Sequence, residues 1–189
     1  WYIDALYSGT QKCLSCPPGL SPMTFSDRAV QATLDRETPV QSWLLDLSLV
    51  ASYWQGDAKS GARTYHHTAP VNTLMGLHEA LRRIVQEGLE NVWARHKAAS
   101  DIIVAGMEEM GFSMLVDANI RLPELLTITL PEGIDDTAVR GKLLNDHRIE
   151  ISAGLGPFAG KLWRIGVMGE GARPENAERV LRAIKALIS

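Results

Sequence analysis

The chain contains few of the residues that mark several classes of protein. Only two of its 189 residues are cysteine, which excludes a disulfide framework and favours a reducing compartment. Its apolar runs stay well short of the roughly 20 residues that a membrane-spanning helix needs. The formal net charge of -3 provides neither a basic nucleic-acid surface nor an acidic tail. What remains, 46% apolar and 22% charged residues, is typical of a globular protein of one or two domains.

The hydrophobic patterns predict a mixed protein in two parts. Up to residue 111 they indicate two short strands followed by helices, the last of which resumes after an interruption at Gly88. Beyond it, short strands accompany two amphipathic helices, one capped by Asp135 and one with Pro174 in its first turn. The predicted strands are 1–7, 23–26, 112–116, 125–131, 149–152 and 162–168; the predicted helices are 26–36, 44–55, 73–111, 135–147 and 173–189, with a polar loop at 57–63. We expect a first part over 1–100 that includes a long connecting helix, and a small C-terminal α+β domain over 101–189.

Two motifs look more informative than their context allows. Cys13 and Cys16 form a C-x-x-C, but a zinc site needs four ligands and no second pair is present. A thioredoxin-like motif would open a helix, whereas Pro17 and Pro18 follow at once. We therefore expect no metal site and two small, buried thiols.

The segment "YHHT" (65–68) contains adjacent histidines. In an extended segment His66 and His67 would point to opposite faces, so we do not expect them to share a metal. Tyr65 and Thr68 supply hydroxyl groups that could meet a phosphate, although the residues of the segment taken alone favour a plain polar loop.

The segment "GLGPFAGK" (154–161) approaches two phosphate-binding motifs and matches neither. A P-loop requires glycine at Leu155 and a hydroxyl residue at Leu162. A dinucleotide fingerprint requires a helix directly after the glycines, but Pro157 and an apolar strand follow. The segment is predicted to be a flexible loop that leads into the strand "LWRIGVM".

Two cations stand in places where a charge needs an explanation. Arg164 lies within the apolar strand "LWRIGVM", where desolvation requires an anionic partner. That partner is either a carboxylate of the same chain or a ligand carboxylate held in a bidentate fork. Lys12 stands among small polar residues ahead of a rigid Pro-Pro-Gly, a setting that suits a fixed amine, and a fixed amine can form a Schiff base.

Four segments in sequence, "SGTQKCLSCPPG", "YHHTAPVN", "GLENVWARH" and "GLGPFAGKLWRIGVMG", closely resemble the alanine–glyoxylate (serine–pyruvate) aminotransferases. These are class V, fold-type I enzymes of pyridoxal 5'-phosphate (PLP). The resemblance runs along the whole chain and corresponds to the C-terminal half of the family. It implies an α/β fold in which the end of a large PLP domain is followed by a small α+β domain. Because the chain opens at Trp1 within what reads as a strand, we expect a further segment upstream.

The resemblance also implies roles for particular residues. Lys12 matches the catalytic lysine that forms the aldimine with PLP, and Gln11 matches a residue that contacts the cofactor phosphate. Tyr65 and Thr68 match residues that reach the phosphate of the partner subunit in a homodimer. Arg164 matches the arginine that binds the substrate carboxylate.

The implied reaction is a ping-pong transamination from alanine or serine to glyoxylate or pyruvate. The family's acidic partner of the pyridine nitrogen falls upstream of Trp1, so we expect this chain alone to have little activity. The alternatives are ureidoglycine–glyoxylate, aminoethylphosphonate or serine–glyoxylate aminotransferases, a cysteine desulfurase, or a non-catalytic dimerisation fragment. Partners other than small amino and oxo acids, such as nucleic acid or a membrane, are not expected. We expect a cytoplasmic location, with the peroxisome or mitochondrion as the alternative in a eukaryote.

Overall fold

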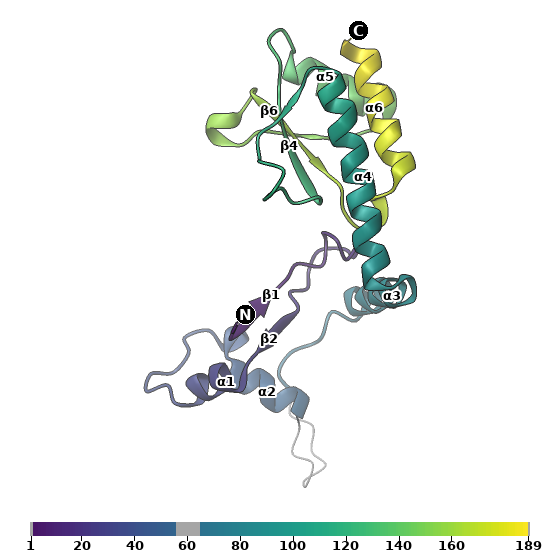
Figure 1. The fold of residues 1–189 in the computed structure, drawn as a ribbon. Coiled ribbons are helices and arrows are strands. Elements are labelled where there is room, and N and C mark those ends of the chain that lie inside the picture. The colour runs from purple at the N-terminus through teal and green to yellow at the C-terminus, as the bar shows by residue number, and fades with distance from the viewer. Residues whose placement is uncertain (1, 56–64, 189) are drawn as a thin grey trace. The chain divides into compact units, whose positions relative to one another are not determined.

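The computed structural model describes residues 2–55 and 65–188. These residues form two compact units. The ribbon in Figure 1 is coloured by residue number, so the segments of each unit can be found along it. The first unit contains residues 1–10 and 17–77, and the second contains residues 11–16 and 78–189. The short segment 11–16 therefore packs with the C-terminal part of the chain, although its sequence neighbours belong to the first unit. The predicted domain boundary near residue 100 refers to the family's domains and stays a prediction.

The first unit begins with a two-stranded antiparallel sheet. Strands β1 (Ala5–Tyr7) and β2 (Met23–Phe25) pair with Leu6 opposite Thr24. Helix α1 (Asp27–Leu34) follows β2 directly, because the Ser26 side chain accepts a hydrogen bond from the Ala29 backbone N–H (3.2 Å) and caps the helix. The predicted N-cap at Ser26 is confirmed.

The helix predicted over 44–55 is divided in the structure. A 3₁₀ turn (η1) spans Trp43–Leu45, and α2 spans Leu47–Gln55. The division occurs at Asp46, whose backbone is extended and whose carboxylate accepts a hydrogen bond from the Ser48 backbone N–H at 3.0 Å. Asp46 thus supplies a helix start that the apolar periodicity alone did not indicate. The polar loop predicted at 57–63 lies outside the described residues.

Helices α3 (Val71–Glu87) and α4 (Leu89–Glu109) are separated at Gly88, as the sequence predicts. The backbone of Gly88 has φ +87°, a region that glycine enters without steric cost. The chain can therefore turn between the two helices within a single residue.

The second unit contains a four-stranded antiparallel sheet in the order β3–β4–β6–β5. Its strands are β3 (Ser113–Met114), β4 (Leu125–Thr129), β5 (Ser152–Ala153) and β6 (Leu162–Gly166). The remaining helices are α5 (Asp136–His147) and α6 (Pro174–Ile188), together with the 3₁₀ turns η2 (Gly156–Phe158) and η3 (Gly169–Gly171). The Asp135 side chain caps α5 by accepting from the Ala138 N–H (2.9 Å), as predicted. The strand predicted over 149–152 is shorter and later in the structure, where β5 spans only Ser152–Ala153.

One face of this sheet is covered by helices and the other is not. Figure 1 shows α4 and α6 side by side, and their apolar residues form one core with α5 and the sheet. The strands contribute Leu126 and Ile128 from β4 and Trp163 and Ile165 from β6. Because side chains alternate along a strand, Thr127 and Arg164 lie on the opposite face, where the strand register places them side by side.

No helix in the described part of the chain is long and apolar enough to cross a membrane. Within residues 2–55 and 65–188, no cluster of three histidine, cysteine or carboxylate side chains is arranged to hold a metal ion.

Candidate functional site

Lys12 lies in a tight turn of the second unit. The Ser15 backbone N–H donates to the Lys12 carbonyl at 2.9 Å, which closes a four-residue turn around Cys13 and Leu14. The Lys12 side chain is exposed, and across the described part of the chain it has neither a hydrogen bond nor an ion pair. The turn therefore presents a free primary amine from a backbone of defined shape.

The two cysteines beside Lys12 are not joined. Cys16 is buried and Cys13 is partly buried, and neither forms a disulfide bond. Burial raises the pKa of the Cys13 thiol, and the negative charge of Glu124 raises it further. Cys13 is consequently held in the neutral thiol form, which is a poor nucleophile. The prediction of two buried thiols is confirmed for Cys16 and only in part for Cys13.

Arg164 lies in the centre of β6 on the face that the helices leave open. Its Nε donates to the Ala153 carbonyl of β5 at 2.9 Å. No carboxylate in the described ranges lies within ion-pair distance of Arg164, and its two terminal nitrogens have no hydrogen-bond acceptor there. The sequence allows two kinds of partner for Arg164. The first, a carboxylate of the same chain, is not found near Arg164 among residues 2–55 and 65–188. The two terminal nitrogens are therefore available for an external anion.

Thr127 adds a second polar group beside Arg164. It is directly opposite Arg164 in the β4–β6 pairing. Its Oγ1 is buried and has no hydrogen-bond partner among the residues described. A buried hydroxyl without a hydrogen-bond partner costs free energy, so Thr127 is a polar residue beside Arg164 that the described residues leave unsatisfied. Sequence reasoning did not identify Thr127, because only the register between β4 and β6 brings it to Arg164.

In the first unit, Tyr65 and Thr68 come together. The Tyr65 hydroxyl lies 2.6 Å from Thr68 Oγ1, and the Tyr65 side chain is 71% exposed. Two hydroxyl groups at this separation form a compact donor set of the kind that binds phosphate oxygens. This pair belongs to the first unit, whereas Lys12 and Arg164 belong to the second.

The expectation that His66 and His67 point to opposite faces is wrong. Their Nδ1 atoms lie 2.8 Å apart, and their rings meet edge to face. The segment is not a regular strand, so the alternation of a strand does not apply. His66 is buried against Trp43, with ring centroids 4.0 Å apart, and its Nε2 lies 3.2 Å from the Trp43 carbonyl. His66 therefore fixes the start of the segment that carries Tyr65 and Thr68.

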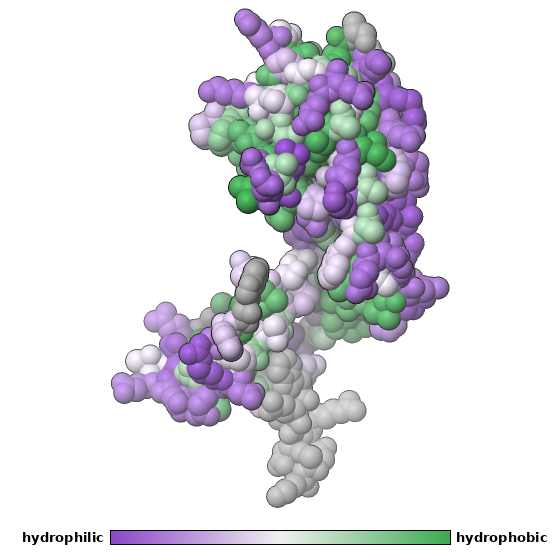
Figure 2. All heavy atoms as spheres, viewed as in Figure 1, coloured by the Kyte–Doolittle hydropathy of each residue, from purple (hydrophilic) through white to green (hydrophobic). Residues whose placement is uncertain are grey.

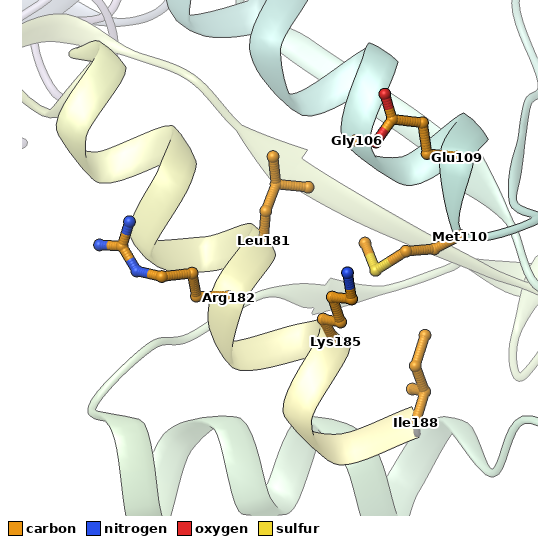
Figure 3. A pocket seen from close by; sticks show the side chains of 7 residues that line it. All are labelled: Gly106, Glu109, Met110, Leu181, Arg182, Lys185 and Ile188. Carbon is orange, nitrogen blue, oxygen red and sulfur yellow. The ribbon is translucent and has the colours of Figure 1, made fainter.

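The rest of the second unit offers an open groove between α4 and α6 (Figure 3). The groove has a volume of about 500 Å³ and is lined by residues such as Met110, Leu181 and Lys185. Gly106 lets the two helices approach closely, because a Cβ at this position would lie 2.5 Å from Leu181 Cδ1. None of the candidate site residues lines this groove, so it is a consequence of helix packing and not part of the site.

The loop "GLGPFAGK" is followed by β6 rather than a helix, which confirms that neither phosphate-binding motif applies. Gly154 allows the loop to fold back, since a Cβ there would lie 2.1 Å from the Phe158 carbonyl oxygen. The loop thus connects β5 to β6 and delivers Arg164 to the open face.

Comparison with known proteins places these features in a family. The family model "Aminotransferase class-V" matches residues 1–160. The chain belongs to the class-V aminotransferases. Enzymes of this family depend on PLP, and their fold is the α/β fold of fold-type I enzymes, to which the mixed structure described above conforms.

Relatives of this class-V aminotransferase chain agree in sequence and in structure. Alanine–glyoxylate aminotransferase from Felis catus is 40% identical over 184 residues, which cover 97% of this chain and 44% of the relative. (S)-Ureidoglycine–glyoxylate transaminase from Bacillus subtilis is 36% identical over 206 residues, covering 100% and 48%. The crystal structure of alanine–glyoxylate aminotransferase from Nostoc sp. matches with a TM-score of 0.91 and 43% identity, covering 99% of this chain and 48% of that chain. The chain thus spans about half the length of the relatives it matches.

Proposed function

We propose that this protein is a PLP-dependent aminotransferase that moves the amino group of alanine or serine to glyoxylate or pyruvate. The observation that carries the proposal is a pair of cations in the second unit, the Lys12 amine and the Arg164 guanidinium, for which residues 2–55 and 65–188 supply no anionic partner. A transaminase needs an amine that holds the cofactor and transfers a proton. It also needs a fixed guanidinium group that binds the substrate carboxylate through two hydrogen bonds. Membership of the class-V family supports the assignment of these roles.

Lys12 would hold the cofactor through its side-chain nitrogen, since a primary amine condenses with an aldehyde and releases water. Once the amino donor has displaced it, the same nitrogen would take the proton from the donor Cα. It would then deliver this proton to the cofactor. When bound, PLP would supply the electron-withdrawing ring that accepts the electron pair of the broken Cα–H bond. The tight turn around Lys12 would limit the positions from which the amine reaches that proton.

Arg164 would bind the α-carboxylate of the donor and of the acceptor. Its Nε is already held by the Ala153 carbonyl, so the planar group is oriented before substrate arrives. Its two terminal nitrogens match the spacing of two carboxylate oxygens, and Thr127 Oγ1 lies on the neighbouring strand.

Gln11 and the Tyr65–Thr68 pair would bind the phosphate of the cofactor. Gln11 is exposed and directly precedes Lys12. The Tyr65 and Thr68 hydroxyls would reach the phosphate in the partner subunit of a homodimer, in keeping with the exposure of Tyr65. We also propose a cytoplasmic location, which suits two cysteines that form no disulfide bond.

Attachment of PLP tests the central assignment. We expect PLP to be fixed to Lys12 by borohydride reduction, with the modified residue identified by peptide mass spectrometry. Lys12→Ala should abolish this labelling, because it removes the amine to which PLP is fixed, whereas Lys161→Ala, which removes another exposed lysine of the second unit, should leave it unchanged. Labelling that persists in Lys12→Ala would overturn the assignment.

The substrate is a second question with its own measurement. The Bacillus subtilis relative is named for ureidoglycine, so that donor is the alternative which the comparisons favour. A panel of alanine, serine, ureidoglycine and aminoethylphosphonate, with glyoxylate or pyruvate as acceptor, would separate these. A desulfurase is disfavoured by the raised pKa of Cys13, because desulfuration needs a thiolate nucleophile.

A further inference from the structure

The turn that carries Lys12 contacts a second turn far along the chain. Ser15 Oγ accepts a hydrogen bond from the Glu170 backbone N–H at 2.7 Å. Gly169, the first residue of η3, faces the same hydroxyl so closely that a Cβ there would lie 1.8 Å from Ser15 Oγ and 3.3 Å from the Cys13 carbonyl oxygen. Both turns belong to the second unit. The contact therefore depends on a serine on one side and a glycine on the other.

Ser15 adopts a backbone conformation that serine rarely takes. Its φ is +57°, in the left-handed region where glycine is at ease and other residues are strained. A glycine would make this turn at lower cost. The serine hydroxyl, however, is the group that accepts the Glu170 N–H, and glycine could not replace it. Strain at a non-glycine residue that makes a specific contact is typical of functional turns.

The Gly169 turn is itself held firmly by α4. His96 is buried, and its Nε2 accepts the Gly169 N–H at 2.9 Å, while its Nδ1 lies 2.7 Å from the Val92 carbonyl. Arg95 Nη1 donates to the carbonyls of Gly169 and Ala172, both at 2.8 Å. Both polar ends of the Gly169 residue are thus bonded to neighbouring residues of one helix.

Arg95 is in turn fixed by an acid. Its Nε lies 2.6 Å from Glu87 Oε1, and the Arg95 side chain is only 14% exposed. The hydrogen bonds to Glu87 raise the pKa of Arg95 and lower that of Glu87, so both are charged. The turn therefore rests on an ion pair rather than on a mobile side chain.

The same turn follows the strand that carries Arg164. Strand β6 ends at Gly166, and the next residue, Val167, is buried and donates its N–H to the Glu124 carbonyl at 2.8 Å. Gly169 therefore begins a rigid turn shortly after a rigid strand. Gly169 is thus connected to β6 along the chain and to the Lys12 turn through its contact with Ser15.

We propose that Ser15 and Gly169 are positioning residues that hold the Lys12 turn in register with the Arg164 strand. This inference rests on the proposed function, because it assigns a purpose to the relative placement of the amine and the carboxylate fork. Neither residue needs to touch substrate or cofactor. The contact would act by fixing the backbone from which Lys12 extends.

Two glycines of one turn give a matched test. Gly169→Ala puts a methyl group against Ser15 Oγ at a backbone φ of +59°, whereas at Gly171 a Cβ would meet nothing within 4 Å. In PLP-saturated protein we expect Gly169→Ala to reduce the borohydride-trapped label at Lys12 about tenfold, and Gly171→Ala to leave it unchanged. The pH midpoint of the visible absorbance of the attached PLP should shift in the first variant only.

Ser15→Gly separates the contact from the shape of the turn. This variant relieves the strain at φ +57° but removes the acceptor of the Glu170 N–H. We expect labelling at Lys12 to fall about two- to tenfold, the range of a lost hydrogen bond. Arg148→Gly, which relieves the other strained residue at φ +54°, should have no effect on labelling. Equal or better labelling in Ser15→Gly would overturn the proposal.

Amide hydrogen exchange of residues 12–15 distinguishes this proposal from the proposed function. Faster exchange of this turn in Gly169→Ala and Ser15→Gly, with an unchanged melting temperature, supports the positioning contact whether or not PLP binds. Unaltered exchange and labelling in both would overturn it. Failure of the unsubstituted protein to be labelled at Lys12 would instead overturn the proposed function. If Gly169→Ala lowers the melting temperature, Ser15→Ala is the milder variant in which the same two measurements decide.

Discussion

Arg164 keeps its charge in a strand whose flanking residues, Trp163 and Ile165, are buried in the core. The alternation of β6 resolves the conflict, because it sends the guanidinium to the opposite face of the sheet from these two side chains. There one nitrogen bonds to the Ala153 carbonyl and the remaining two have no partner in the residues described. A cation placed in this way keeps two nitrogens available for an external carboxylate, which is the role that we propose for it.

Replacing Arg164 with lysine tests this interpretation at the scale of one residue. Lysine keeps the positive charge but loses the planar fork, so a bidentate carboxylate contact becomes a single one. We expect Arg164→Lys to weaken the binding of alanine roughly ten- to a hundredfold, the value of one charged hydrogen bond. The measurement is the titration of the PLP absorbance with alanine. Arg179→Lys, in a helix away from this face, is the control and should bind alanine normally.

The junction between β1 and α1 depends on Asp4. Its carboxylate bonds to the Arg28 guanidinium and accepts from Ser26 Oγ at 2.7 Å, and its carbonyl accepts the Ser26 N–H at 2.9 Å. The hydrogen bonds from Arg28 and then Ser26 lower the pKa of Asp4 from 3.8 to about 2. The residue that caps α1 is thereby tied to the strand before it.

The titration of Asp4 provides a prediction at the scale of an element. A carboxyl group with a lowered pKa stabilises the fold above its unfolded pKa, and this stabilisation is lost as the pH falls from about 4 to about 2. We expect the NMR signal of the Asp4 carboxyl carbon to titrate with a midpoint near 2. Arg28→Ala should move the midpoint upward, because Arg28 is the largest cause of the shift. An unchanged midpoint would contradict the assigned hydrogen bonds.

Helix α5 is joined to the sheet by a partly buried carboxylate. Asp136 accepts from Trp163 Nε1 at 2.8 Å and from Arg140 Nε at 2.6 Å, and only 11% of its side chain is exposed. The Arg140 hydrogen bond is the largest cause of the lowered pKa of Asp136. Because Trp163 is fully buried, its indole N–H has no water to replace this acceptor.

We expect Asp136→Ala to lower the free energy of unfolding by about 1–3 kcal/mol, since it leaves a buried N–H without a partner. Asp101→Ala, which breaks an exposed pair with Lys97, should cost less than about 0.5 kcal/mol. Urea denaturation followed by circular dichroism measures both. Because the pKa of Asp136 is lowered, the difference between Asp136→Ala and the unsubstituted protein should be present above about pH 4 and shrink as the pH falls below it. A difference independent of pH would contradict the ion pair.

The two units differ in how well they bury their own apolar side chains. In the described part of the first unit, the buried residues are the polar Thr10 and His66, while large apolar side chains such as Leu6, Trp43 and Leu45 are more than half exposed. The second unit has an extensive core that includes Trp163, Met107 and Ile184. Figure 2 shows apolar side chains at the surface in several places. Monomeric globular proteins rarely expose apolar surface of this extent.

This imbalance leads to a prediction for the whole molecule. We expect the 189-residue chain by itself to show little or no transfer of amino groups from alanine to glyoxylate, because the Tyr65–Thr68 pair belongs to a unit whose described residues form no apolar core. Measured turnover comparable with that of a complete relative would contradict this. The homodimer that the proposal requires can be checked by analytical sedimentation of the protein with and without PLP. A monomer under both conditions would count against the homodimer.

What the amino-acid sequence by itself determined is local or linear. The N-caps at Ser26 and Asp135 and the interruption at Gly88 follow from the chemistry of single residues and their neighbours. The order of segments along the chain was enough to indicate the class-V family, and the strand around Arg164 already called for an anionic partner, either of the same chain or of a ligand. Lys12, Gln11, Tyr65 and Thr68 were named from that order, and their roles stay predictions.

The tertiary structure decided what depends on distant parts of the chain meeting. Thr127 comes to Arg164 only through the register of β4 and β6, and Ser15 meets Glu170 across a separation that no periodicity encodes. His66 and His67 likewise depart from the alternation of a strand. Their orientation follows from the stacking of His66 on Trp43 and from the contact between the two histidine rings. The physical reason is the same in each case. Hydrogen bonds and packing act over a few ångströms in space, so the fold, and not spacing along the chain, selects which groups they join.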